Sequence, residues 1–158
     1  MNMEKKFELT DNFIINAFGV KLFQIKCTKS FKYAKEGDLG GYVEKDENLD
    51  QESDAWVSGD ARVYGNAEVS GDAEVSGDAE IDNNNKHCGF DCFGSANRHT
   101  HAYLTKENKV EITCGCFRGS IEEFEKRVEE THSGTIYEKQ YKAIIDVIKI
   151  KFGLTDLI

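Results

Sequence analysis

The sequence predicts a mainly β protein with an α+β part: a short left-handed parallel β-helix between an N-terminal β cap and a C-terminal module of one hairpin and two helices. Three observations predict this fold class. A six-residue repeat occupies residues 54–82, alternating apolar residues precede it, and helical periodicity with capping residues follows it. We therefore divide the chain into residues 1–43 as the β cap, 44–85 as the repeat and 86–158 as the C-terminal module.

In the predicted cap, apolar residues alternate or occur in pairs, which is the pattern of short strands. The cap ends in a glycine-rich turn at residues 36–41. Because a short stack of repeats needs covered ends to bury its inner face, we expect this segment to cover one of them. Its apolar positions are Phe7, Phe13, Ile15, Phe18, Val20, Leu22, Phe23 and Ile25.

The repeat carries one alanine in every six residues, an aliphatic residue two positions later, and a Gly-Asp or Gly-Asn pair between units. Such a unit predicts one short strand with its aliphatic side chain inward, followed by a corner that uses the backbone freedom of glycine. An amphipathic helix is excluded, since each glycine would cost it about 1 kcal/mol. The in-phase positions are Ala55, Ala61, Ala67, Ala73 and Ala79, and Val57, Val63, Val69, Val75 and Ile81.

In the C-terminal module, residues 102–104 and 110–113 flank a polar loop and predict a β-hairpin. Ser120 and Glu123 form a capping box that opens one helix. Thr135, with a glutamate three residues later, opens a second. The apolar faces of these helices are Ile121, Phe124 and Val128, then Tyr137, Tyr141, Ile144, Ile145, Ile148 and Phe152.

Two resemblances follow from these motifs. The runs GVKLFQI and FKYAKEGDLGGYVEKDENL, followed by the hexapeptides, resemble the hexapeptide-repeat proteins common in bacteriophages and prophages, over residues 7–82. Residues 94–145 resemble a module that often follows phage repeats, through a Gly-Ser-x-Asn turn, a Cys-Gly-Cys-Phe-x-Gly motif and a Thr-His-x-Gly motif. The histidines at 99 and 101 depart from that module. The resemblance implies a phage origin and this architecture, and it implies no reaction.

Charge is divided unevenly along the chain, whose net charge is −9. Residues 36–82 have 15 acidic and two basic residues, a charge of −13, and the rest of the chain carries +4. We therefore expect the acidic repeat to repel nucleic acid and anionic membranes, whereas the mildly basic remainder attracts anions. No apolar run approaches the roughly 18 residues of a membrane span, and residues 1–13 show no signal-peptide core, so we expect a cytoplasmic location in a host cell.

The predicted ligand-binding residues lie in the C-terminal module. Glycine-rich turns offer backbone N–H groups, and arginine side chains bind phosphate or other anions. We expect an anionic small molecule, held by Ser95, Asn97, Arg98, Cys114, Cys116, Arg118 and His132, with the start of the first helix beside them.

A zinc site is the first alternative, because seven histidines and cysteines lie within about 30 residues and zinc needs four ligands. Their spacing lacks a C-x2-C pair, so we expect free thiols, no resident metal and no cofactor, with His99 and His101 exposed at a hairpin edge. The seven are His87, Cys88, Cys92, His99, His101, Cys114 and Cys116.

An enzyme is the second alternative. The sequence has no G-x-S-x-G, H-E-x-x-H or phosphate-loop motif, and we expect no catalysis. A degenerate hexapeptide acyltransferase is the least improbable activity, but no histidine occurs between Gly37 and Lys86 to serve it.

We therefore expect a non-enzymatic, phage-type binding protein that acts in counter-defence. It would sequester a nucleotide-like anionic signal or bind a host effector protein. The alternative function is that of a structural or assembly module of a phage, without a ligand. A short stack with open ends also favours self-association into a homo-oligomer.

Overall fold

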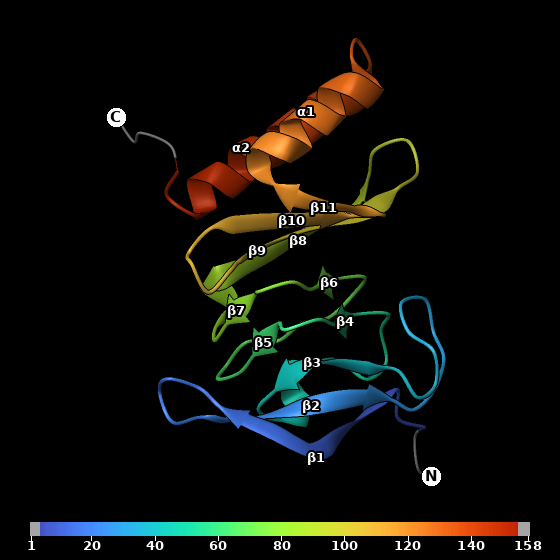
Figure 1. Cartoon of the computed structure of the whole chain (residues 1–158). Coiled ribbons are helices and arrows are strands. Elements are labelled where there is room, and N and C mark those ends of the chain that lie inside the picture. The colour runs from blue at the N-terminus through green and yellow to red at the C-terminus, as the bar shows by residue number, and fades with distance from the viewer. Residues whose placement is uncertain (1–3, 155–158) are drawn as a thin grey trace. The chain divides into compact units, whose positions relative to one another are not determined.

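A computed structural model describes residues 4–154 of the chain. The outer ends of the predicted first and third segments, residues 1–3 and 155–158, lie outside the described residues. The chain divides into two compact units, residues 1–84 and 85–158, whose elements Figure 1 labels. Each unit is described by itself.

Unit 1 is built on a mixed five-stranded sheet with the order β1-β2-β3-β5-β7. Strands β1 (Phe7–Ile15), β2 (Lys21–Cys27) and β3 (Leu39–Val43) pair antiparallel, as the alternating apolar residues of the cap predict for strands. Strands β5 (Arg62–Val63) and β7 (Glu80–Ile81) then join in parallel. The repeat thus extends a sheet that begins as an antiparallel one.

A separate two-stranded parallel ladder in unit 1 joins β4 (Trp56–Val57) to β6 (Glu74–Val75). Two short 3-10 helices, η1 (Asp46–Asn48) and η2 (Asn84–Lys86), flank the repeat. The alanine and aliphatic positions of the repeat are buried, which confirms that these side chains point inward. Their exposed fractions are 0–1% at Ala55, Val57, Ala61, Val63, Ala67, Val69, Ala73, Val75, Ala79 and Ile81.

The predicted left-handed parallel β-helix is wrong as the fold class. The structure instead contains a mixed sheet, a two-stranded parallel ladder and an antiparallel sheet. The strands of the repeat are only two residues long; β4 and β6 form the separate parallel ladder, whereas β5 and β7 pair into the mixed sheet. Strands β5 and β7 continue the mixed sheet because one edge of β3 pairs with β2 and its other edge leaves backbone groups that pair with β5.

Unit 2 contains an antiparallel four-stranded sheet with the order β11-β10-β9-β8. Its strands are β8 (His87–Phe93), β9 (Arg98–Leu104), β10 (Val110–Cys114) and β11 (Phe117–Ser120). The predicted hairpin is confirmed as β9 and β10, which form the centre of the sheet. Sequence analysis missed the outer strands, whose histidines, cysteines and glycines obscure the β pattern.

Two helices cover one face of this sheet (Figure 1). Helix α1 (Ile121–His132) begins after Ser120, whose hydroxyl accepts a hydrogen bond from the Glu123 N–H, so the capping box is confirmed. Helix α2 (Ile136–Lys151) follows Thr135, but the Thr135 hydroxyl donates to the His132 carbonyl at 2.7 Å and does not cap the helix. Within residues 4–154, no helix is long and apolar enough to cross a membrane.

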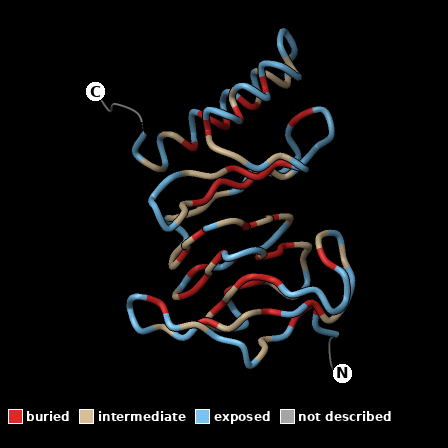
Figure 2. The backbone as a smooth tube through the Cα atoms, in the orientation of Figure 1, coloured by how far each residue is buried: buried red, intermediate tan, exposed pale blue. Residues whose placement is uncertain are grey.

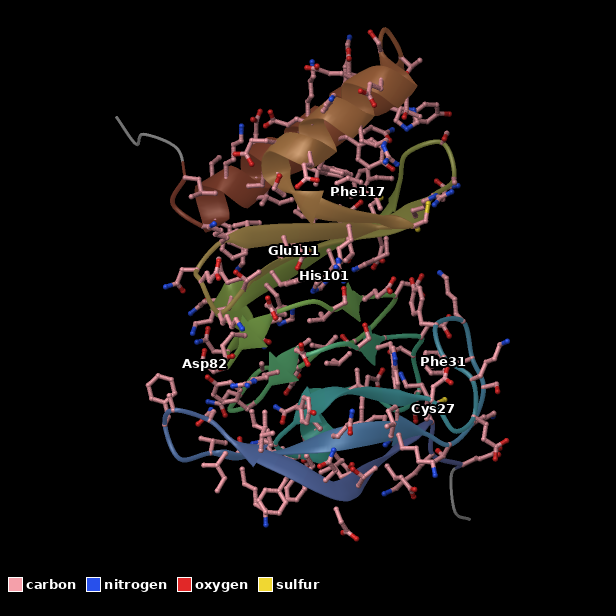
Figure 3. All side chains as sticks on the ribbon, in the orientation of Figure 1. Cys27, Phe31, Asp82, His101, Glu111 and Phe117 are labelled. Atoms are coloured by element: carbon pink, nitrogen blue, oxygen red, sulfur yellow. The ribbon has the colours of Figure 1, made fainter. Side chains whose placement is uncertain are left out.

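The core of unit 2 lies between the helices and the sheet, and Figure 2 shows buried stretches in both. Figure 3 shows Phe117 on the side of the sheet that the helices cover, and His101 and Glu111 on the other side. The fully packed side chains are Ala102, Ile112, Cys114, Ile121, Phe124, Val128, Tyr141, Ile144, Ile145 and Ile148.

Candidate anion-binding pocket

A pocket of about 220 Å³ opens at one end of the unit 2 sheet, between two strand turns and α1. We call it the arginine pocket. It is lined by Ser95, Ala96, Arg98, Cys114, Cys116, Phe117, Phe124, Arg127, Val128, Thr131, His132 and Tyr141.

The turn between β8 and β9 forms one rim of the arginine pocket. Gly94 and Asn97 both adopt positive φ angles, of 81° and 49°, and the Asn97 N–H donates to the Gly94 carbonyl at 3.3 Å. The Gly94 N–H donates to Gln140 Oε1 at 2.9 Å, and the Tyr141 hydroxyl lies against the Gly94 backbone. The turn is thereby fixed to α2, which places Ser95 at the pocket.

The tight turn between β10 and β11 forms the opposite rim. Cys114 pairs with Phe117, and the two residues between them make the turn, with Gly115 at a φ of 57°. A two-residue hairpin turn of this kind needs positive φ, which glycine adopts at no steric cost. The same missing side chain leaves room for the Arg98 guanidinium, which lies against the Gly115 backbone.

Behind this turn, a small polar group of side chains is buried beneath the pocket. Thr100 Oγ1 donates to Cys114 Sγ at 3.3 Å, and Cys114 Sγ lies 3.8 Å from the Tyr141 hydroxyl. Burial raises the pKa of Tyr141, and the neighbouring Cys114 raises it further, while Arg98 acts in the opposite sense. Tyr141 therefore stays neutral and offers a hydroxyl to the pocket.

Aromatic rings form the wall of the arginine pocket on its helix side. The Phe117 and Phe124 centroids are 5.2 Å apart, and Phe124 meets Tyr141 edge-on at 5.5 Å. His132 stacks on Tyr141 with centroids 5.5 Å apart. The Arg127 guanidinium lies over the Phe117 ring at 5.5 Å, within the range of a cation–π contact. These contacts hold the wall and one cation in place.

The arginine pocket is lined by two cationic guanidiniums and by no carboxylate, because no Asp or Glu is among its lining residues. Within the described part of the chain, neither Arg98 nor Arg127 has a carboxylate within 4.0 Å. Arg118, by contrast, forms an ion pair with Glu111 in which Nε lies 3.2 Å from Oε1. Two unneutralised guanidiniums in an acid-free hollow attract an anion and can bind it with two parallel N–H donors each.

Five of the seven predicted binding residues line this pocket: Ser95, Arg98, Cys114, Cys116 and His132. The other two do not. Asn97 shapes the turn through its backbone, and Arg118 forms an ion pair with Glu111, so neither side chain is among the residues that line this pocket. The first three residues of α1, beside which the prediction also placed the ligand, do not line the pocket, whereas Phe124 and later residues of that helix do.

Sequence analysis missed Arg127 and Thr131. They stand four residues apart, so they share one face of α1, and Arg127 is also three residues beyond the buried Phe124. That spacing was the available signal. It places both side chains on the edge of the helix that borders the core, where a polar side chain can reach a pocket.

The cysteines are all free thiols. In the described range 4–154, no group of three or more His, Cys, Asp or Glu side chains is placed to hold a metal ion. Cys116 and His132 both line the arginine pocket, but no hydrogen bond connects them within that range. The described side chains therefore do not fit the zinc alternative, and no thiol in the pocket is paired with a base.

A second polar feature of unit 2 is a chain of three imidazoles. His87 Nδ1 lies 2.9 Å from His101 Nε2, and His101 Nδ1 lies 2.9 Å from His99 Nε2. His99 Nδ1 in turn contacts the Asp91 carboxylate. The prediction that His99 and His101 are exposed hairpin-edge residues is wrong: the His101 residue is 4% exposed, and the side chain of His99 is 8% exposed.

The partners assign the protons along this chain. The Asp91 carboxylate accepts, so His99 Nδ1 donates to it and His99 Nε2 accepts. His101 Nδ1 then donates to His99 Nε2, and His87 Nδ1 donates to His101 Nε2. Burial lowers the pKa of His101 well below its ordinary value and that of His87 to about 4, so we assign both as neutral. The nitrogens point at one another along a line and do not converge on a common point, which suits hydrogen bonding and not metal binding.

Unit 1 has a larger hollow of about 960 Å³, which makes a weaker candidate. Its cationic side chains already have partners: Lys5 pairs with Asp46 at 3.6 Å, Lys29 pairs with Glu4 at 3.4 Å, and the Lys6 ammonium donates to two backbone carbonyls. Because these lysines are engaged and Glu52 and Asp54 also line the hollow, it suits an anion less well than the arginine pocket does.

A comparison with known protein families and with curated proteins finds no match to this chain.

Proposed function

We propose that unit 2 is a non-enzymatic binding module that takes a nucleotide-like anionic small molecule in the arginine pocket. The observation that carries this proposal is the pair Arg98 and Arg127, which lie on different elements, line one hollow and have no carboxylate partner in the described chain. A guanidinium that already has an acid partner gains little from a second anion, whereas an unneutralised one gains charge-assisted hydrogen bonds.

Binding is favoured over catalysis by the other lining groups. The nucleophilic candidates, Cys114 and Cys116, have no hydrogen-bonded base among the described side chains, and Cys114 is engaged with Thr100 and Tyr141. Nucleophilic catalysis needs an adjacent base or another means of activating the thiol. The pocket instead combines donors with an aromatic wall, which are the groups that recognise a charged ring compound.

The biological setting of the proposal comes from the phage resemblance of the sequence. A compact protein that holds a nucleotide-like signal in the host cytoplasm would keep that signal from its receptor and so act in counter-defence. This role requires only affinity and abundance, since sequestration acts through the concentration of the free signal.

The proposal is tested by recovering the full chain from infected host cells and weighing it by native mass spectrometry. We expect a bound anion on the wild-type protein that is lost on denaturation. The double variant Arg98→Ala/Arg127→Ala should carry none, because it removes the two unneutralised charges.

The matched control is Arg118→Ala, which removes an arginine of the same sheet that is already paired with Glu111. It should retain the anion. An equal loss in the control, or an anion still present on the double variant, would overturn the assignment of this pocket.

A further inference from the structure

The size of the arginine pocket restricts what enters it. Its volume of about 220 Å³ lies below the range of about 300–1,000 Å³ that is usual for pockets that enclose drug-sized ligands. A dinucleotide, linear or cyclic, exceeds a drug-sized ligand and cannot be enclosed here. One ring with one charged group is the largest unit that the hollow can surround.

The balance of hydrogen-bonding groups restricts the chemistry further. Arg98 and Arg127 carry only donors, and no Asp, Glu, Asn or Gln side chain lines the pocket. The edge of a nucleobase presents donors as well as acceptors and is best matched by carboxylate or amide side chains, in place of which this lining has only hydroxyl oxygens and one imidazole as side-chain acceptors. A phosphate monoester presents acceptors alone and carries up to two negative charges, so it matches what the lining offers.

The aromatic wall gives the ring of the ligand a place to pack. Phe117 is only partly buried, and the rings of Phe124, Tyr141 and His132 continue the wall toward the end of α1. Arg127 lies over the Phe117 ring, so a phosphate bound to this guanidinium holds its attached ring close to the wall.

From the volume of the arginine pocket, its hydrogen-bond donors and its aromatic wall, we infer that it binds one phosphate monoester on a single sugar ring. A sugar phosphate fits this description, and so does a nucleoside monophosphate whose base stays outside the pocket. This inference rests on the proposed function and names its ligand class. Arg98 from β9 and Arg127 from α1 both donate hydrogen bonds to the phosphate, and the sugar ring packs against the aromatic wall.

Calorimetric titration of the full chain with a graded set of probes tests the inference. The probes are ribose, inorganic phosphate, ribose 5-phosphate, a nucleoside 5′-monophosphate and a cyclic dinucleotide. We expect ribose 5-phosphate and the monophosphate to bind at least tenfold more tightly than inorganic phosphate and the cyclic dinucleotide, with no binding of ribose. Arg98→Ala and Arg127→Ala should each weaken ribose 5-phosphate by tenfold or more, and Arg118→Ala should leave it unchanged.

The outcomes separate this inference from the proposed function. If the cyclic dinucleotide binds most tightly and the two arginine variants abolish its binding, the proposed function stands and the single-ring inference is overturned. If none of the anionic probes binds, and the protein recovered from cells also carries no anion, both fail. If ribose alone binds as well as ribose 5-phosphate, the phosphate assignment is wrong.

Discussion

The guanidinium of Arg98 lies against the backbone of Gly115, in the space that any larger residue at 115 would need. The β10–β11 turn and the first residue of β9 therefore share one packing arrangement, in which a glycine required by the turn also positions a pocket cation.

Gly115→Ala is expected to move Arg98 and to weaken binding of an anionic ligand by tenfold or more. It also places a side chain at a φ of 57°, which costs roughly 1–2 kcal/mol of folding stability. Gly71→Ala is the matched control, since Gly71 has a φ of 69° and nothing lies within 4 Å of its added methyl group. Calorimetry and urea unfolding should show similar stability losses in both variants and an affinity loss only at 115.

Cys116 reports on the charge of the pocket, because its thiol is exposed and lines the same hollow as Arg98 and Arg127. We expect it to react faster with iodoacetate than with iodoacetamide, after each rate is divided by that of a free thiol. The guanidiniums attract the anionic reagent, and added salt should reduce the preference. Cys92 is the internal control, as it is exposed and outside the pocket lining.

Peptide mass spectrometry of partially alkylated protein measures both cysteines in one sample. The same preference at Cys92 and Cys116, or its persistence in Arg98→Ala/Arg127→Ala, would show that the pocket arginines do not cause it.

The imidazole chain depends on the missing side chain of Gly89, which lies opposite His101 in the β8–β9 pair. A methyl group added at Gly89 would lie 2.6 Å from His99 Cε1 and 2.7 Å from His101 Nδ1. Gly89→Ala is therefore expected to lower the free energy of unfolding by about 1–3 kcal/mol, the usual cost of overpacking. In a His99→Ala background one of the two clashing rings is gone, so Gly89→Ala should lower the free energy of unfolding by less. Urea unfolding of the wild type, the two single variants and the double variant measures the difference.

The chain of three imidazoles also makes the folding stability of the protein depend on pH. Burial lowers the folded-state pKa of His87 to about 4, from an ordinary value of 6.5, with Lys151 contributing in the same direction. Between these values the unfolded chain binds more protons, so stability is full above about pH 6.5 and is lost as the pH falls toward 4. Since one pKa unit corresponds to about 1.4 kcal/mol, and His87 is partly exposed, we expect this residue to contribute about 2 kcal/mol of that loss.

Urea unfolding of the wild type and of His87→Asn at pH 4.5 and pH 7 isolates this contribution from that of the carboxylates. The variant should show the smaller pH dependence. Parallel pH profiles for the two proteins would contradict the assignment.

Lys6 stabilises unit 1 through an ammonium group that is withdrawn from solvent. Its Nζ donates to the Ser53 carbonyl at 2.7 Å and to the Ala55 carbonyl, and burial lowers its pKa to about 8. Lys6→Met keeps much of the apolar stem but leaves both carbonyls without this donor, so we expect a loss of about 2 kcal/mol in urea unfolding. Lys5→Met removes only an exposed ion pair with Asp46 and should change stability by less than about 1 kcal/mol.

Local signals were sufficient to predict much of unit 2. Ser120 and Glu123 predict the start of α1 because a capping box involves only backbone groups within one turn. Arg98 and Cys114 were both assigned to the site, and they meet because an antiparallel pair brings the start of one strand beside the end of the next.

What the sequence left open depends on contacts between distant segments. Arg118 and Arg127 look equivalent in the sequence, yet strand alternation turns Arg118 away from the face that carries Phe117, toward Glu111. The predicted fold class was wrong for a similar reason. The hexapeptide period predicts which side chains are buried, but not that β5 and β7 continue an antiparallel sheet.

The pairing within the repeat also limits how this chain can change in length. Val57 lies beside Val75, and Val63 beside Ile81, so each partner is found 18 residues further along. Inserting or deleting a single hexapeptide would shift every later strand onto the wrong neighbour, whereas a change of three hexapeptides would restore the pairing. Duplications and deletions within the repeat should therefore be tolerated mainly in blocks of three units.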